Sequence, residues 1–570
     1  MRDGIKIAID VYLPAQPKKP TLLPTILHQT RYWRSLDYRW PWSWFKDQTP
    51  RGLMALYAQR FLEQGYAWVD MDVRGSGASF GSRPYAFSMK EIEDGAEIVE
   101  WIIQQPWSNG KIGALGISYG GTAAELLLVN QHPAVQAVAP MFSGFDLYSE
   151  IAFPGGVHLS WFTQTWSFIN RKLDQNELPF SSWLTDLVVQ GVRPVDEDTD
   201  STLLQQAIKE HKPNWSPHQE ALGLTFRDDV PPSHATTSID CLSPQTYMET
   251  ISQSGAAIYG YSGWFDGGYS FAAIKRFWAH NKPGHQLTLG PWDHGGKRHV
   301  SPINQGPAYF DHQAELLSFF DRHLKPSTGS GDEHSPVHYY TMVEERWKSA
   351  NSWPPPSTKT PYYLDAHRSL SKGLPAAHPG FDRYPVDPSA GTGPHTRWNT
   401  LVGKPLLTPY PNRVTRTANL LAYTSPSLEH DMEVTGHPIL TLFIKSTTPD
   451  ATLFAYIDDV DESGNVTYVT EGMLRALHRQ LQNPPAFYPT DLPYRTYTQN
   501  SGSPLQPHHV TRLVFDMLPI SYQFKKGHQI RLTLSGADQD HFTSLPGPPS
   551  TLTFLFSETH PSRLDLPVVR

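Results

Sequence analysis

Residues 116–121 read Gly-Ile-Ser-Tyr-Gly-Gly, between an apolar run at 112–117 and a helical pattern at 122–129. A strand, a sharp turn and a helix in this order are the setting of a nucleophile elbow, the G-x-S-x-G motif. Glycines two positions before and after the serine let the strand and the helix approach closely, so the hydroxyl faces the carboxyl edge of the sheet. The stretch predicts a nucleophilic serine, Ser118, whereas the alternative is a structural Gly-Ser turn.

Strand and helix signals alternate on both sides of this motif, which is the pattern of an α/β sheet. The expected strands are 5–12, 25–29, 67–72, 112–117 and 135–141, with a helix at 92–103. The alternation stops after residue 144 and resumes at 251, with strands at 256–261 and 286–290 and helices at 271–281 and 311–324. The segment between, 145–250, is rich in aromatic residues and polar helical stretches, and we expect it to form a mainly helical cap over the active site.

Helix signals nearly vanish beyond a proline-rich stretch at 352–356, which predicts a rigid linker. Short strands separated by Pro, Gly, Asn and Asp are expected at 441–446, 453–460, 466–470, 512–517, 529–535 and 551–557. This spacing predicts a β-sandwich of the jelly-roll type. The predicted domains are an α/β core in two parts, 1–144 and 251–355, the cap at 145–250, and the sandwich at 356–570.

The composition narrows the class of protein. The chain has 570 residues, of which 39% are hydrophobic and 18% charged, an ordinary globular balance with material for several domains. Its net charge of -8 and the lack of a Lys/Arg-rich run argue against nucleic acid and anionic membranes as partners. Cys241 is the single cysteine, which excludes an internal disulfide and a Cys-rich zinc site.

The sequence also bears on the compartment. No run of 18 apolar residues is present, so no membrane-spanning helix is expected. The N-terminus lacks the apolar region of a signal peptide, and together with the single cysteine this favours the cytoplasm. Because the chain enters structure at once, its N-terminus could be truncated. A homodimer is a separate possibility that the sequence leaves open.

A nucleophilic serine needs an imidazole to take its proton and a carboxylate to orient that imidazole. In α/β-hydrolases these partners follow the serine in the order Asp or Glu, then His, each just after a later strand. Asp266 and His294 meet this condition. The alternatives are His285 or His299 as the base, Asp293 as the orienting group, and Asp266 as the cap of the following helix.

The tetrahedral intermediate of acyl transfer needs hydrogen-bond donors for its oxyanion. The backbone N–H of Tyr119, the residue after the nucleophile, is the usual first donor. The loop after the strand at 25–29 reads Thr-Arg-Tyr-Trp-Arg and lacks the HGGG motif that supplies a backbone donor. The hydroxyl of Tyr32 is therefore the candidate second donor, unless Tyr32 is an aromatic residue of the core or pocket.

Several motifs occur together and in order: RDGIKIAIDVYLP at 2–14, DVRGSGASFG at 72–81, QPWSNGKIGALGISYGG at 105–121, GWFDGG at 263–268, GPWDH at 290–294, GHPILTLFIKS at 436–446 and GHQIRLTLS at 527–535. This set resembles the CocE/NonD hydrolases, the cocaine-esterase and X-Pro dipeptidyl-peptidase family, over essentially the whole chain. The resemblance implies an α/β-hydrolase core, a helical cap and a C-terminal jelly roll.

The same resemblance implies residue roles. It makes Ser118, Asp266 and His294 the catalytic triad, with the Tyr119 N–H and the Tyr32 hydroxyl as the oxyanion hole. Tyr32 lies in Arg-Tyr-Trp, where family members often have Pro-Tyr, so its neighbours differ. No metal and no cofactor is expected for this chemistry.

The expected substrate is a small ester or amide. An apolar pocket for a bulky or aromatic acyl group is expected from aromatic residues beside the site and in the cap: Trp33, Trp161, Trp166, Trp264, Phe265 and Trp292. A dipeptidyl-peptidase would need carboxylates that bind a free α-amino group, and the cap offers Glu150, Asp174, Glu177 and Asp186 without a reason to choose among them.

An esterase is therefore favoured over an X-Pro dipeptidyl-peptidase. Two further alternatives are an acyltransferase on the same scaffold and a non-catalytic protein that binds carbohydrate through its jelly roll.

Overall fold

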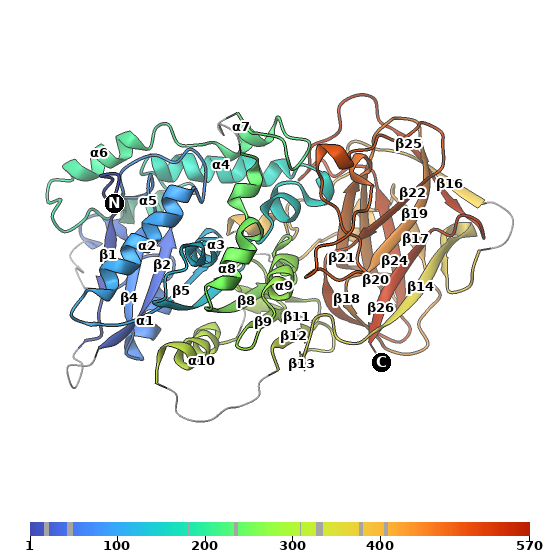
Figure 1. Ribbon diagram of the computed structural model, residues 1–570. Coiled ribbons are helices and arrows are strands. Elements are labelled where there is room, and N and C mark those ends of the chain that lie inside the picture. The colour runs from blue at the N-terminus through green and yellow to red at the C-terminus, as the bar shows by residue number, and fades with distance from the viewer. Residues whose placement is uncertain are drawn as a thin grey trace.

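A nine-stranded sheet forms the centre of the N-terminal half of the chain (Figure 1). The computed structural model describes residues 1–15, 22–42, 49–180, 182–232, 237–307, 309–326, 335–375, 380–403 and 408–569. The strands lie in the order β1 (Ile9–Tyr12), β4 (Ala67–Asp72), β2 (Leu23–Thr30), β5 (Ser108–Ile117), β6 (Val135–Met141), β8 (Ala257–Gly263), β9 (Gln286–Gly290), β12 (Val337–Thr341) and β13 (Arg346–Ala350). The strands from β4 to β12 are parallel and the two edge strands are antiparallel.

Both faces of this sheet are covered by helices, which is why its strands are apolar on both sides. On one face α1 (Ala55–Glu63) and α10 (His312–Leu324) pack over Ile26 and Leu115. On the other, α2 (Met89–Ile103) and α3 (Tyr119–Leu126) pack over Leu27 and Ala114. Neighbouring residues of one strand thus enter opposite cores, as the two-residue period of a strand requires.

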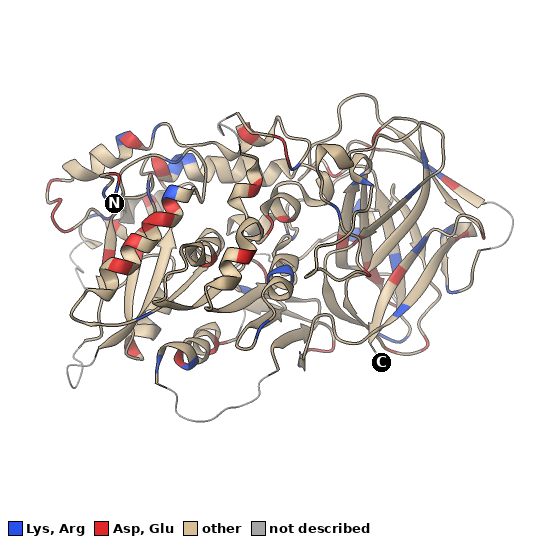
Figure 2. Cartoon of the chain, viewed as in Figure 1, with Lys and Arg blue, Asp and Glu red and all other residues tan. Residues whose placement is uncertain are grey.

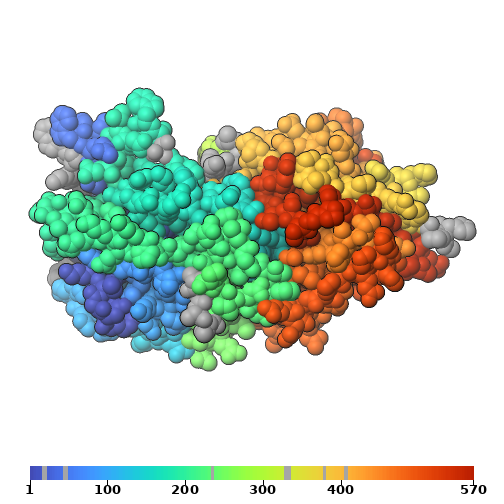
Figure 3. Space-filling model, turned by 90° about the horizontal axis from the view of Figure 1, so that it is seen from above, coloured from blue at the N-terminus to red at the C-terminus, as the bar shows by residue number. Residues whose placement is uncertain are grey.

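The cap leaves the sheet between β6 and β8. It consists of α4 (Ser160–Asp174), α5 (Trp183–Val188), α6 (Thr202–Glu210), α7 (Pro217–Ala221) and α8 (Met248–Gln253), with short helical turns between them. One strand of the cap, β7 (Val189–Val192), pairs with β3 (Leu36–Tyr38), which follows β2 in the core. The cap is therefore mainly helical, but one backbone ladder ties it to the core. Seen from above, cap segments cover the core and reach the C-terminal half (Figure 3).

The C-terminal half is a jelly-roll sandwich. Its strands include β14 (Thr358–Asp365), β16 (Gly380–Pro385), β17 (Leu421–Thr424), β18 (Met432–Gly436), β19 (Ile439–Ser446), β20 (Thr452–Val460), β21 (Val466–Arg475), β22 (Thr511–Asp516), β23 (Ile520–Phe524), β24 (Gln529–Ser535), β25 (Thr551–Phe556) and β26 (Arg563–Val569). The pairing is antiparallel apart from one parallel bridge of β17 to the short strand β15 (Ser369–Ser371).

The proline-rich linker is packed between the two halves. Trp353 is buried, its ring lies 5.6 Å from that of Trp264, and its carbonyl accepts a hydrogen bond from Trp278 Nε1 at 2.9 Å. One apolar core accordingly runs from the nine-stranded sheet into the sandwich. The two halves are thus fixed to each other through a continuous packed interface.

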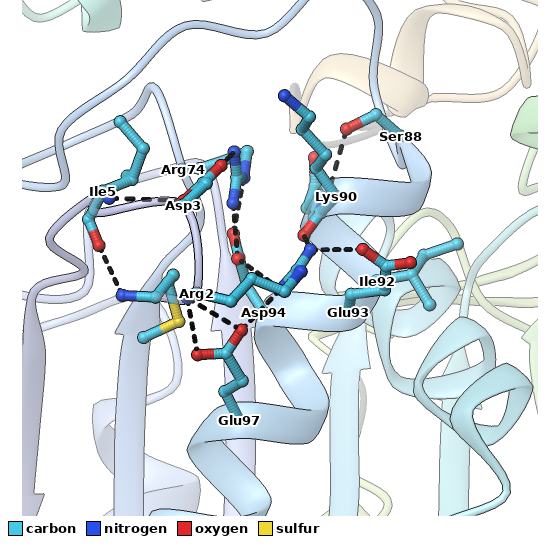
Figure 4. A network of polar contacts seen from close by, with 12 residues as sticks. Arg2, Asp3, Ile5, Arg74, Ser88, Lys90, Ile92, Glu93, Asp94 and Glu97 are labelled. Carbon is cyan, nitrogen blue, oxygen red and sulfur yellow. Dashed lines mark hydrogen bonds and ion pairs between the residues drawn. The ribbon is translucent and has the colours of Figure 1, made fainter.

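Charged side chains tie the start of the chain to α2, where acidic residues gather (Figure 2). Arg74 contacts Asp94 at 2.5 Å and Asp3 at 2.9 Å, and Arg2 contacts Glu97 at 2.6 Å (Figure 4). The hydrogen bond from Arg74 lowers the pKa of Asp3 to about 2. These contacts hold residues 2–3 against the helix that covers the sheet.

The sequence patterns predicted strands well in both halves, since 67–72 and 135–141 match β4 and β6, and 529–535 matches β24. The first strand is shorter than expected, and α2 begins three residues earlier. The sequence analysis did not predict the strands β12, β13 and β14 to β18. None of the helices in the described ranges is both long and apolar enough to cross a membrane.

Phe320 on α10 tests the core packing. It is fully buried, its ring lies 5.8 Å from that of Phe61, and a Cβ on Gly113 of β5 would meet it at 2.6 Å. Because the backbone around it cannot close the cavity, Phe320→Ala should lower the free energy of unfolding by about 3–5 kcal/mol. Denaturant unfolding measures this, with Phe381→Ala as the control because Phe381 is 53% exposed on β16. Equal effects of the two substitutions would contradict the packing described.

Candidate active site

Ser118 lies in a strained turn between β5 and α3. Its backbone has φ 61° and ψ -119°, a conformation that costs a residue with a Cβ about 1–3 kcal/mol. The turn is held from both sides, because Ser118 N donates to Met141 O at 3.0 Å and Ser118 O accepts from Thr122 N at 3.0 Å. A serine fixed in this way has its side chain lifted out of the strand, as the elbow motif predicts.

Three glycines allow this turn to form. A Cβ on Gly116 would lie 2.4 Å from the carbonyl carbon of Gly120, and one on Gly121 would lie 2.8 Å from the carbonyl oxygens of Gly116 and Met141. All of these neighbours are backbone atoms, which cannot move aside. On the underside, a Cβ on Gly120 would lie 3.2 Å from Nε2 of His28. Gly116 and Gly121 are therefore required by contact distances, since neither has a positive φ.

Asp266 and His294 meet at the same edge of the sheet. Residues Gly263 and Gly290 are partners in the parallel pair β8–β9, so the loops that follow them are neighbours. His294 Nδ1 lies 2.6 Å from one carboxylate oxygen of Asp266, and Ser262 Oγ donates to the other at 3.0 Å. Both side chains are buried. Because a carboxylate only accepts, Nδ1 carries a proton, which leaves Nε2 as the basic nitrogen.

Tyr269, the first residue of α9 (Tyr269–Ala279), lies between this pair and Ser118. Its side chain lines the same pocket as Ser118, and its ring centre lies 5.7 Å from that of His294. The loop after His294 also reaches the elbow, since a Cβ on Gly295 would lie 3.7 Å from Cγ2 of Ile117. Sequence reasoning missed Tyr269. A signal was available, because the residue stands three positions after Asp266, where a helix begins on the same loop.

The other candidates for base and orienting group lie elsewhere or have other partners. Asp293 accepts hydrogen bonds from the backbone of Lys297 and Arg298 at 3.1 and 2.9 Å, within its own loop. His285 packs beside His280, and His299 packs against Tyr340. The Asp266 carboxylate does not cap α9, whose N-terminal cap is Gly268 without a side-chain bond.

Two candidate hydrogen-bond donors, Tyr119 and Tyr32, line the same pocket as Ser118. Tyr119 is the first residue of α3, so its N–H is one of the N–H groups that a helix leaves without an internal acceptor. Tyr32 lines the same pocket as Ser118, and its hydroxyl accepts a hydrogen bond from Trp166 Nε1 at 2.9 Å. Because the indole only donates, the tyrosine proton remains directed elsewhere. Burial raises the pKa of Tyr32, so the hydroxyl stays protonated at neutral pH.

The segment that carries Tyr32 is fixed to cap helix α4. Arg31 forms a 2.6 Å ion pair with Asp174, and Trp33 Nε1 donates to the Leu173 carbonyl at 3.2 Å. With the Trp166–Tyr32 bond, three consecutive residues thus bond to one helix of the cap. The differing neighbours of Tyr32 therefore have a role of their own, because they set where the cap lies over the site.

An apolar pocket with about 820 Å³ of empty space, part of it open to solvent, lies over Ser118. All three parts of the protein line it: Phe87 in the core, Phe162, Trp166 and Leu224 in the cap, and Leu401 in the sandwich. Leu401 comes from a segment that the sequence analysis did not consider. The pocket has room for a bulky apolar group next to the serine.

Five of the six aromatic residues expected to line this pocket pack elsewhere, and Trp166 alone is among its lining. Trp33 bonds to α4, Trp161 packs against His541, Trp264 donates to Tyr340 O, Phe265 packs against Tyr468 and Trp292 stacks on Tyr261. Nearness in sequence to a candidate catalytic residue was misleading. Trp264, Phe265 and Trp292 stand within two residues of Asp266 or His294, but their side chains are buried in the core.

The four acidic residues considered for an amine site also lie outside the pocket lining. Glu150 pairs with Lys275 at 2.7 Å, Asp174 with Arg31, and Glu177 with Lys172 at 2.5 Å, while Asp186 is exposed on α5. Among the lining residues that the structure describes, Glu220 on α7 is the single acid. A pair of carboxylates for an α-amino group is therefore missing from the described lining.

Two protein-family models match the two halves of the chain. The model of the X-Pro dipeptidyl-peptidase (S15 family) matches residues 3–296, and that of the X-Pro dipeptidyl-peptidase C-terminal non-catalytic domain matches 329–565. The chain belongs to the S15 family. It is therefore a serine hydrolase, with the fold of the CocE/NonD hydrolases.

Individual relatives agree with this assignment. A protein of Mycobacterium tuberculosis named "Putative serine esterase MT1883" is 51% identical over 100% of this chain and 94% of its own length. The cocaine esterase of Rhodococcus sp. is 25% identical, covering 94% of this chain and 89% of the relative. Among solved structures, an α-amino acid ester hydrolase superposes with a TM-score of 0.72 at 19% identity, covering 100% of this chain and 95% of the other.

Gly121→Ala tests the elbow of this hydrolase. Since the added methyl group would lie 2.8 Å from two backbone carbonyls, the turn must open and the serine must move. We expect labelling of Ser118 by a fluorophosphonate to slow by about 100-fold, the cost of a displacement of about 1 Å. The matched control is Gly223→Ala, because a Cβ there meets nothing within 4 Å. Unchanged labelling of the Gly121 variant would contradict the contacts described.

Proposed function

We propose that this S15-family hydrolase cleaves carboxylic esters with a bulky or aromatic acyl group, using Ser118 as nucleophile, His294 as base and Asp266 as the orienting acid. The observation that carries the proposal is the 2.6 Å contact of Asp266 with His294, at the sheet edge where the strained Ser118 turn lies. Such a constellation has no use in a protein that only binds a ligand.

The reaction follows from the atoms available. His294 Nε2 accepts the proton of Ser118 Oγ as the oxygen attacks the acyl carbonyl. Asp266 holds the imidazole by its Nδ1 proton and stabilises the imidazolium that forms. The imidazolium then gives its proton to the leaving alcohol as the acyl-enzyme forms. Water attacks this ester in turn and loses a proton to His294. The imidazolium then returns that proton to Ser118 Oγ as the bond to the acyl group breaks and the acid is released.

The oxyanion that forms in both steps needs two donors. The Tyr119 N–H is suited to this, because it lies at the positive N-terminal end of α3, next to the nucleophile. The Tyr32 hydroxyl is the second donor, since Trp166 occupies its acceptor side and leaves its proton for the oxyanion. Tyr269 lines the pocket beside Ser118 and His294, so we assign its hydroxyl to holding the resting nucleophile by a hydrogen bond.

The acyl group is assigned from the pocket lining. Phe87, Phe162, Trp166 and Leu224 surround an empty space next to Ser118, and burial of an apolar or aromatic group there is favourable. The esterases among the relatives are consistent with this choice. The family description makes an X-Pro dipeptidyl-peptidase the second candidate, and the missing pair of carboxylates in the described lining argues against it.

Two substrates separate these candidates. We expect the protein to hydrolyse an aromatic-acyl p-nitrophenyl ester and to leave Gly-Pro-p-nitroanilide intact. The reason is that the described pocket lining is apolar and contains no pair of carboxylates to bind an α-amino group. Ser118→Ala should lower the ester rate by on the order of 10⁴–10⁶-fold. Cleavage of the anilide would establish the peptidase instead, and full activity of the Ser118 variant would refute the assignment of the nucleophile.

The two tyrosines should behave differently when their hydroxyls are removed. Tyr32→Phe should lower kcat about 10²–10³-fold, the effect of losing an oxyanion donor. Tyr269→Phe should lower it about tenfold or less, the effect of one ordinary hydrogen bond of about 1 kcal/mol. Steady-state kinetics of the ester measures both, with Tyr423→Phe as control, since Tyr423 bonds to Asp382 at 2.8 Å within the sandwich. The reverse order would exchange the two roles.

A further inference from the structure

The loop that carries Asp266 is bound by a segment of the C-terminal domain. Gly267 N donates to Arg397 O at 3.2 Å, and Thr400 Oγ1 donates to Phe265 O at 3.3 Å. A Cβ on Gly267 would also meet Leu401 at 2.8 Å, so the two segments touch without a gap. The segment 397–401 comes after β16 and belongs to the domain whose family model is described as non-catalytic.

Arg397 makes the strongest of these contacts through its side chain. Its Nη2 donates to Trp264 O at 2.5 Å and its Nε donates to Gly267 O at 2.8 Å. These carbonyls belong to the residues two before and one after Asp266, so the guanidinium bridges the two arms of the turn. Its carbon Cζ also lies 5.9 Å from the centre of the Phe265 ring. The planar fork of an arginine fits two carbonyls in a way that a lysine cannot.

Arg397 is itself held rigidly from the sandwich side. It is fully buried, its Nη1 donates to the Tyr468 hydroxyl at 3.4 Å, and its backbone N donates to the Tyr410 hydroxyl at 3.2 Å. The rings of Tyr410 and Tyr468 stack with centres 3.6 Å apart. Tyr410 in turn donates to Glu471 at 2.7 Å, and that carboxylate also accepts from Trp398 Nε1 at 2.5 Å. The guanidinium is therefore held in place while it binds residues 264–267, the acid loop that carries Asp266.

The placement of this charge is unusual. A buried cation is costly unless it is compensated, and Glu471 attracts the charge of Arg397 from a distance, without a direct ion pair among the described residues. Its donors go instead to two backbone carbonyls beside the catalytic acid. Packing the two domains together does not require this, because Trp353, Trp264 and Phe265 already form an apolar interface.

We propose that Arg397 is a positioning residue for the reaction: it fixes the turn that carries Asp266, so that the C-terminal domain sets the geometry of the acid–base pair. The proposal rests on the proposed function of Asp266. Because Asp266 accepts from His294 and Ser262 with both oxygens, a shift of its loop changes the direction of the imidazole. The C-terminal domain then has a part in catalysis beyond lining the pocket with Leu401.

Arg397→Lys tests this by a double-mutant cycle with Asp266→Asn. Lysine keeps the buried charge but reaches one carbonyl at most, so the turn loses at least one of its two hydrogen bonds to this side chain. In the otherwise unchanged enzyme we expect kcat for the ester, and the rate of Ser118 labelling by a fluorophosphonate, to fall about 10–100-fold, with KM changed less than about threefold. In the Asp266→Asn background the same substitution should change the labelling rate less than about threefold, since its effect passes through Asp266.

Arg413→Lys is the matched control. Arg413 is also buried in the C-terminal domain, and it bonds to Asp458 at 2.9 Å without contact to the acid loop. It should lower thermal stability as Arg397→Lys does while leaving kcat within about twofold, because no catalytic group depends on it. A second readout is the low-field proton resonance of the His294 Nδ1–H, which should shift in the Arg397 variant and stay unchanged in the Arg413 variant.

The outcomes separate this proposal from the function on which it depends. If Asp266→Asn leaves the activity intact, the proposed triad is wrong. If Asp266→Asn is inactive but Arg397→Lys costs the same in both backgrounds, or no more kcat than Arg413→Lys, the positioning role is wrong and the triad stands. A lower labelling rate of the Arg397 variant when Asp266 is intact, without a matching loss in the Asp266→Asn background, supports the proposal.

Discussion

The close approach of β5 and α3 at Ser118 is the constraint on which the rest of the site depends. The positive φ of Ser118 is tolerated because Gly116 and Gly121 let backbone meet backbone at distances that exclude a Cβ. The same turn sets the start of α3 at Tyr119, and so the direction of the N–H groups that face the nucleophile. Strain at one residue is thus offset by packing of the strand and helix around it.

The three parts of the chain each contribute something that the others lack. The parallel sheet brings the ends of β5, β8 and β9 to one edge, where Ser118, Asp266 and His294 follow them. The cap fixes Tyr32 through Trp166 and supplies most of the apolar wall. The sandwich supplies Leu401 and binds the acid loop. The site is therefore a product of domain contacts, and the continuous core between the halves is what keeps it assembled.

Sequence reasoning succeeded where the determinants are local. The elbow is encoded within six residues, and the order of strands places Asp266 and His294 on neighbouring loops, so both followed from pattern alone. It failed for the pocket, because nearness in sequence does not give the direction of a side chain: Trp264 and Trp292 flank the acid and the base but point into the core. Arg397 and Leu401 could not be predicted, since they reach the site only through long-range packing of a different domain.

The most direct test of the account is a crystal structure of the protein after reaction with a phosphonate ester, whose tetrahedral adduct resembles the acylation intermediate. The account predicts a bond from Ser118 Oγ to phosphorus, with one phosphoryl oxygen within about 3 Å of both Tyr119 N and the Tyr32 hydroxyl, and the organic group in the apolar pocket. An adduct on another residue, or a phosphoryl oxygen directed away from both donors, would contradict it.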